Sequence, residues 1–132
     1  MIAIDTNVLV RIIVEDTEQP EQTQIARDLI KNAETVYITQ IVQIELTWVL
    51  AKVYKVGKIN LISVLEHLLE NPAFILQNTD IFSEALILFT QGQADFSDYL
   101  ILSESLFIEA ELYSFDKRLG KHNKVKLLSC VN

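Results

Sequence analysis

Short apolar runs alternate along this chain with longer stretches of helical periodicity. Each run is separated from the next by segments whose apolar residues recur every three or four positions. Strands that alternate with helices in this way predict a parallel sheet covered by helices on both faces. We therefore expect an α/β protein. The five predicted strands are residues 1–4, 35–39, 73–77, 111–115 and 124–128.

The length and composition predict one domain that spans residues 1–132. Half of the 132 residues are hydrophobic, and glycine and proline are scarce, so we expect an ordered core. No apolar stretch approaches the roughly 18 residues that a membrane span needs. The single cysteine, Cys130, cannot form an internal disulfide. These features favour a cytoplasmic protein without a membrane segment.

Glycine and short polar residues predict where the helices begin and end. Asp5 follows the first predicted strand and opens the turn into a helix. Gly57 is placed to end the helix of residues 40–55 with a left-handed cap, and Asn60 is placed to cap the next helix. We expect Asp95, Ser97 or Asp98 to cap the helix of residues 95–110.

Three acidic residues are predicted to lie at the same edge of the sheet. Asp5 and Asp116 follow the first and fourth strands, and parallel strands place their carboxyl ends together. Asp98 lies in the first turn of a helix that enters from that edge. Each residue also has a purely structural interpretation, because Asp5 and Asp116 are good helix caps and Asp98 could complete a capping arrangement opened by Asp95.

Glu45 is an acid within a helix whose neighbouring positions are apolar. Its neighbours three and four residues away are Ile41, Val42, Trp48 and Val49. This pattern predicts that Glu45 lies on the core face, where an isolated charge costs several kcal/mol. We expect it to join the other acids in one pocket, although a buried arginine would also satisfy it. Four close carboxylates that ligate through oxygen alone favour Mg²⁺ or Mn²⁺, and a phosphodiester substrate.

The charge is distributed unevenly. The net charge of −7 argues against a nonspecific nucleic-acid binder, and all 18 acids lie within residues 1–116. Residues 117–132 hold five of the 11 lysines and arginines. This basic segment is either a solvated surface or a phosphate-contacting one. We expect Lys117, Arg118 and Lys121 to contact phosphate groups of the substrate, and Arg11 to contact the substrate or a partner.

Four motifs carry a resemblance to a known family. They are "IDTNVLVR" at 4–11, "VQIELTWVL" at 42–50, "ADFSDYLI" at 94–101 and "YSFDKRL" at 113–119. In their order and spacing the chain resembles the PIN-domain nucleases, and within them the VapC-like toxins of toxin–antitoxin pairs. The resemblance covers essentially the whole chain.

The resemblance implies a three-layer α/β/α sandwich with a central five-stranded parallel sheet, and Mg²⁺- or Mn²⁺-dependent endoribonuclease activity. It assigns Asp5, Glu45, Asp98 and Asp116 to the acidic quartet that binds metal. It places Thr6, Asn7, Asp95 and Ser114 around that quartet; Ser114 stands where the family commonly has threonine. It also implies a homodimer and a small antitoxin protein that blocks the acidic pocket.

Other readings of the acids remain. A phosphoacceptor receiver needs two adjacent acids after the first strand, where this chain has Asp5 alone. A haloacid-dehalogenase-like phosphatase needs an acid at position 7, which is Asn7. The main alternative is a catalytically silent PIN-like module that binds RNA or a partner protein.

Overall fold

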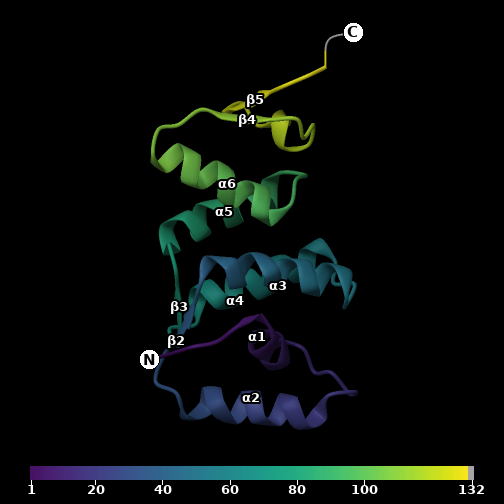
Figure 1. The fold of residues 1–132 in the computed structure, drawn as a ribbon, viewed down its shortest axis with the longest axis vertical. Helices are drawn as coiled ribbons and strands as arrows, with labels where there is room; N and C mark the ends of the chain where they lie inside the picture. Colours follow the sequence, from purple (N-terminus) through teal and green to yellow (C-terminus); the bar gives the residue numbers. More distant parts are fainter. Residues whose placement is uncertain (131–132) are drawn as a thin grey trace. The chain divides into compact units, whose positions relative to one another are not determined.

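The computed structural model describes residues 1–130, in which two consecutive helices separate each of the first three short strands from the next (Figure 1). The chain divides into two compact units, the first ending at Thr79 and the second beginning at Asp80. The first unit holds β1 (Ile2–Ala3), α1 (Thr6–Ile13), α2 (Pro20–Asn32), β2 (Val36–Ile38), α3 (Gln40–Lys52), α4 (Lys58–Glu70) and β3 (Phe74–Leu76). The second unit holds α5 (Thr79–Gln91), α6 (Phe96–Phe107), β4 (Leu112–Ser114), the 3-10 helix η1 (Leu119–Lys121) and β5 (Val125–Leu127). The boundary falls within α5, whose first residue, Thr79, belongs to the first unit.

The first unit is built on a parallel sheet with the strand order β1-β2-β3. Val36 of β2 pairs with Ile2 on one side and Phe74 on the other. Val36 and Ile38 are buried and Phe74 and Leu76 face the same core, whereas the alternate positions are more exposed. The two faces of this sheet are therefore unequally covered.

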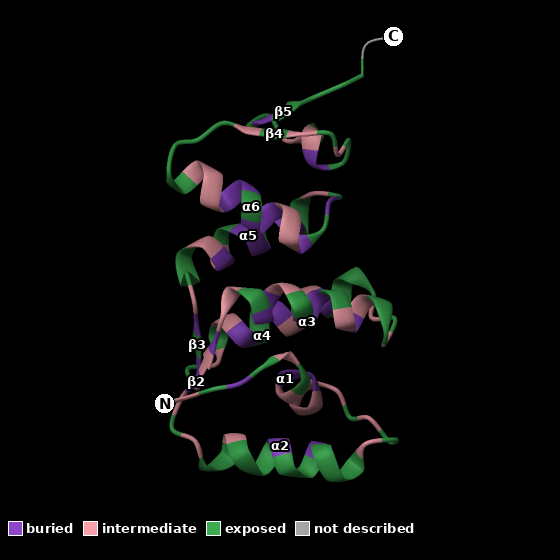
Figure 2. Ribbon diagram, viewed as in Figure 1, coloured by how far each residue is buried: buried purple, intermediate pink, exposed green. Residues whose placement is uncertain are grey.

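Helices α1, α3 and α4 complete the core of the first unit. α3 buries Leu46 and Leu50, and α4 buries Leu65 and Leu68. These positions are three or four residues apart, so each helix presents one stripe to the core. Helix α2 is mostly exposed, burying only Thr23 and Ala26 (Figure 2).

The second unit packs α5 and α6 through aromatic rings. Phe96 of α6 meets Phe82 and Phe89 of α5 edge to face, at ring-centroid distances of 5.3 and 5.9 Å. β4 and β5 form a two-stranded parallel sheet in which Leu112 pairs with Val125. Helix η1 connects these strands.

The prediction of one central five-stranded sheet is wrong for the described residues. The chain does have five parallel strands, but they pair as one sheet of three and another of two. Each strand is two or three residues long, and its hydrogen-bonded partners all lie within its own unit. The α/β class and the strand positions are confirmed.

Two predicted caps are also wrong. α3 ends at Lys52, five residues before Gly57, and Gly57 is instead the N-cap of α4 with φ −77°. Asn60 consequently lies inside α4 rather than ahead of it. The left-handed residue of this loop is Lys55, with φ 57°. The helices of residues 1–130 include none that is long and apolar enough to cross a membrane.

Candidate active site

Asp5 connects the first strand to the first helix. It directly precedes α1 and is its N-cap, and its Oδ1 accepts a hydrogen bond from the Val8 backbone N–H at 3.1 Å. This bond satisfies one of the unpaired N–H groups that every helix start carries. The side chain is otherwise exposed. The capping interpretation of Asp5 is therefore confirmed, and it leaves Oδ2 available to a ligand.

Glu45 does not lie on the core face. The buried residues of α3 are Val42, Gln43, Leu46, Thr47 and Leu50, and Glu45 is exposed. Its apolar neighbours Ile41 and Trp48 are themselves 69% and 48% exposed. Because α3 is apolar on several sides, the sequence pattern did not reveal which side faces the core.

Thr6 joins Glu45 to the start of α1. Its Oγ1 donates a hydrogen bond to Glu45 Oε1 at 3.2 Å, across 39 positions in sequence. The carboxylate is thus held beside the residue that follows Asp5. The structure brings Thr6 and Glu45 into contact here, with Asp5 next to Thr6 in the chain, and among residues 1–130 no buried arginine pairs with Glu45.

Arg11 is engaged within the first unit. Its Nη1 donates to the Tyr54 hydroxyl at 2.9 Å and lies 3.7 Å from Asp16, while its Nε donates to Gln22 at 2.9 Å. These contacts tie α1 to α2 and to the loops that follow α1 and α3. They favour a structural role for Arg11, and its predicted RNA contact stays a prediction.

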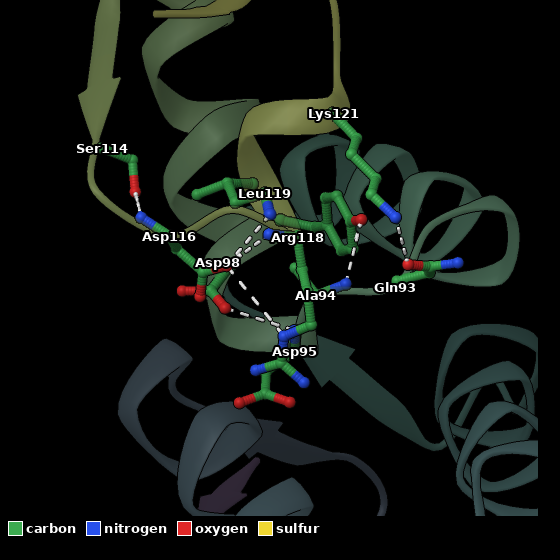
Figure 3. Close-up of polar contacts among 10 residues, drawn as sticks. Gln93, Ala94, Asp95, Asp98, Ser114, Asp116, Arg118, Leu119 and Lys121 are labelled. Carbon is green, nitrogen blue, oxygen red and sulfur yellow. Dashed lines mark hydrogen bonds and ion pairs between the residues drawn. The ribbon is translucent and has the colours of Figure 1, made fainter. Parts of the chain in front are cut away.

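Asp98 and Asp116 lie close together in the second unit (Figure 3). Asp98 is in the first turn of α6, and its Oδ2 accepts a hydrogen bond from the Asp95 backbone N–H at 3.2 Å. This is the capping arrangement that the sequence suggested. The two carboxylates approach from the start of α6 and from the loop after β4.

The surroundings of Asp98 raise its pKa above the ordinary value. Partial burial of the carboxyl group is the largest cause, because it disfavours the charged form. The hydrogen bond from Asp95 N–H acts in the opposite direction. The negative charges of Asp116 and Asp95 raise the pKa further, and the positive charge of Arg118 lowers it.

The loop after β4 is folded around Asp116. Its Oδ1 accepts hydrogen bonds from the Arg118 and Leu119 backbone N–H groups at 2.8 and 3.1 Å. The Asp116 N–H in turn donates to Ser114 Oγ at 2.9 Å. The Arg118 Nε lies 4.0 Å from Asp116 Oδ1, an ion pair between an exposed arginine and a half-buried aspartate. Ser114 therefore holds the turn that presents Asp116, as a threonine hydroxyl would.

The remaining predicted residues lie near one pair or the other. Asn7 is exposed, and it lines with Asp5 a cavity between α1 and α2. Lys117 is exposed. The Lys121 Nζ donates to Gln93 Oε1 at 2.8 Å (Figure 3). Sequence reasoning missed Tyr99, whose buried hydroxyl accepts from Ala94 N–H at 3.2 Å and steadies the turn before Asp95; an aromatic residue one turn into a capped helix was the available signal.

The four acids are candidate ligands for a divalent ion. No group of three or more histidine, cysteine, aspartate or glutamate side chains is arranged to hold a metal within residues 1–130. Asp98 with Asp116, and Asp5 and Glu45 on either side of Thr6, nevertheless offer only oxygen donors. Mg²⁺ is commonly bound through one or two carboxylates, with water and phosphate oxygens as its other ligands. The donor chemistry of each pair therefore fits Mg²⁺ or Mn²⁺.

Comparison with known proteins decides the family. The PIN domain family matches residues 2–125, nearly the whole chain, including all four acidic motifs. The chain belongs to the PIN domain family. PIN domains are typically nucleases and generally use divalent metals, so the chain has the fold of a hydrolase of this type. No curated protein matches the chain.

Proposed function

We propose that this PIN domain is a metal-dependent endoribonuclease and the toxin of a toxin–antitoxin pair. The observation that carries the proposal is the family match over residues 2–125, within which every acid of the family's quartet is present. The proposal treats residues 1–132 as a single nuclease domain acting in the cytoplasm. Its substrate is RNA, and the bond cleaved is a phosphodiester.

Asp5, Glu45, Asp98 and Asp116 are the proposed catalytic acids and the ligands of Mg²⁺ or Mn²⁺. A bound divalent ion would supply positive charge that offsets the carboxylates and the scissile phosphate, and would make water a better nucleophile. The side chains have capping or hydroxyl partners that use only part of their oxygen atoms. Carboxylates held in this way keep their orientation and retain oxygen lone pairs for a ligand.

The surrounding residues have positioning roles in this proposal. Thr6 orients Glu45 through its hydroxyl, and Ser114 holds the turn that carries Asp116. Asp95 fixes the start of α6 and thereby Asp98. Asn7 lies two residues after Asp5 on the same helix start. Lys117, Arg118, Lys121 and Arg11 are the proposed RNA phosphate contacts.

A homodimer and a small antitoxin are the proposed protein partners. Exposed apolar side chains on α3 and α4, including Ile41, Trp48 and Ile59, support an interface on these helices. The antitoxin would block the acidic residues with a basic side chain. Size-exclusion chromatography with light scattering would measure the dimer.

The second candidate function is a catalytically silent module that binds RNA or a partner. It is favoured by the lack of a metal-holding group of three or more side chains in the described part of the chain. Metal-dependent cleavage distinguishes the two candidates, since only the nuclease requires a divalent ion to act.

Cleavage of total RNA by purified protein tests the proposal. We expect discrete fragments with Mg²⁺ or Mn²⁺, and intact RNA with chelator or with Asp5→Ala. Asp98→Asn should abolish cleavage and keep the fold, because asparagine retains an oxygen that can accept from Asp95 N–H. Asp28→Asn is the matched control, since it makes the same change on exposed α2 and should cleave at the wild-type rate.

Wild-type cleavage by Asp98→Asn would remove Asp98 from the catalytic set. Intact RNA in every lane, together with no binding of Mn²⁺, would favour the silent module. Fragments that persist in chelator would contradict the metal requirement and point to a contaminating ribonuclease.

A further inference from the structure

A cavity of about 310 Å³ lies in the second unit, beside the loop that carries Asp116. It is bordered by the end of α5, the turn before α6 and the η1 segment. We call it the η1 cavity; its polar lining comes from Gln91, Gln93, Tyr99, Arg118, Lys121 and His122. None of these residues is one of the four proposed catalytic acids. Arg118 and Lys121 are already proposed RNA phosphate contacts.

The η1 cavity has a basic lining in an acidic protein. Arg118 and Lys121 bring two positive charges, and the lining includes no aspartate or glutamate. The chain as a whole carries −7. A cavity with this local excess of positive charge attracts an anion.

Hydrogen-bond donors in the η1 cavity are held in place. The Lys121 ammonium is anchored by Gln93 at 2.8 Å, which uses one of its three N–H groups (Figure 3). His122 Nδ1 accepts the Lys124 backbone N–H at 3.0 Å. The neutral ring must therefore carry its proton on Nε2, which makes that nitrogen a donor. Anchored donors lose little freedom when a ligand binds.

The wall of the η1 cavity is closely packed. Tyr99 is only 3% exposed, and its hydroxyl is bound by Ala94 N–H. A Cβ at Gly92 would lie 1.8 Å from the Tyr99 hydroxyl oxygen, so glycine permits this approach. The cavity is formed by a packed turn rather than by surface side chains alone.

Arg118 links the η1 cavity to the proposed catalytic acids. It lines the cavity, and its Nε is 4.0 Å from Asp116 Oδ1. An anion bound in the cavity could therefore contact the same arginine that pairs with Asp116. The backbone phosphates of a nucleic-acid strand are anions that recur at a regular spacing.

We propose that the η1 cavity binds a backbone phosphate of the RNA strand, next to the phosphate that is cleaved. The inference rests on the proposed function and adds His122 and Gln93 to the RNA contacts. It also gives different roles to two lysines, because Lys121 lines the cavity and Lys117 does not. Phosphate contacts of this kind set affinity and register rather than sequence preference.

Binding of a short fluorescein-labelled single-stranded RNA in chelator tests the proposal without requiring cleavage. Fluorescence anisotropy is measured over a range of salt concentrations for the wild type, Lys121→Gln and Lys126→Gln. Lys126 is the matched control, because it carries the same charge in the same basic segment but lines a different cavity with Glu109 and Glu111. Melting temperatures verify that each variant is folded.

We expect Lys121→Gln to weaken binding several-fold and to reduce the slope of log affinity against log salt by about 0.7, the value for one phosphate contact on a single strand. Lys126→Gln should keep the wild-type slope. Gln93→Glu, which places a carboxylate beside Lys121, should weaken binding at least as much as Lys121→Gln.

Equal effects of Lys121→Gln and Lys126→Gln would overturn the η1 cavity as a phosphate site while leaving the nuclease proposal intact. Unchanged affinity in Gln93→Glu would overturn it too. A wild type that binds no RNA in chelator overturns it as well, and the cleavage assay then judges the nuclease separately.

Discussion

At the scale of single residues, two aspartates with opposite surroundings have opposite pKa shifts. Asp98 is partly buried beside other carboxylates, and its pKa is raised. Asp16 accepts hydrogen bonds from Glu18 N–H and the Tyr54 hydroxyl, both at 2.9 Å, and its pKa is lowered. Donors that satisfy the charged form favour ionisation, whereas burial and like charges oppose it.

Replacement of Asp98 should increase stability when no metal is present. Its raised pKa means that the folded state binds the proton more tightly than the unfolded state, so its contribution to stability falls as pH rises through the folded pKa. Asp98→Asn should therefore melt at a higher temperature than the wild type at pH 7. The difference should shrink towards pH 3.8, the ordinary pKa. A lower melting temperature for Asp98→Asn at pH 7 would show that the charged hydrogen bond to Asp95 N–H outweighs the repulsion.

Replacement of Asp16 should have the opposite sign. Its lowered pKa means that its stabilisation is complete above the ordinary value of 3.8 and is lost as pH falls through the folded pKa. Asp16→Asn should melt below the wild type at pH 7, and the gap should close on acidification. Thermal melts from pH 7 to pH 2 measure this, with Asp28→Asn as the exposed control. A gap that stays constant with pH would mean that packing, not charge, is responsible.

At the scale of elements, the turn between α5 and α6 is set by one close approach. Gly92 follows α5, and Tyr99 of α6 packs against it. Gly92 stands where helices often end on a glycine. Its φ is not positive, so the need for glycine there comes from the nearby ring and not from the backbone conformation.

Gly92→Ala should destabilise the protein by about 1–3 kcal/mol, because the new Cβ overlaps the Tyr99 hydroxyl. Urea denaturation measures the free energy of unfolding. Gly57→Ala is the control without a steric clash, since a Cβ there meets no atom within 4 Å, and the expected loss is about 0.5–1 kcal/mol from the poorer N-cap of α4. Equal losses in the two variants would show that Tyr99 moves aside at little cost.

At the scale of the whole molecule, the family match covers both compact units, whereas the contacts of the acids described above lie within one unit or the other. The PIN domain match spans residues 2–125 and so includes elements of both compact units. Within each unit the structure describes one pair of acids and the hydrogen bonds that orient it. Single-domain behaviour and metal binding stay predictions that solution measurements must test.

A thermal melt with Mn²⁺ tests metal binding by the whole chain. A ligand that binds only the folded state stabilises it, by about 2.7 kcal/mol when its free concentration is 100 times the dissociation constant. We expect Mn²⁺ to raise the melting temperature of the wild type and of Asp28→Asn, and to raise that of Asp98→Asn less. No shift for the wild type at millimolar Mn²⁺ would favour the silent module.

The sequence by itself determined where the elements lie and which acids stand at their ends. The strand positions, the Asp5 cap and the pairing of Asp98 with Asp95 N–H all follow from interactions between residues a few positions apart. Glycine was a less reliable guide, because Gly57 begins a helix instead of ending one.

Only the tertiary structure decided the exposure of Glu45, its hydrogen bond from Thr6 and the pairing of five strands as two sheets. Each depends on residues far apart in the chain. The apolar positions around α3 allowed more than one face to be buried, and strands of two or three residues have too few side chains to specify their neighbours. Local patterns determine local structure, whereas burial and strand pairing are set by which distant segments pack together.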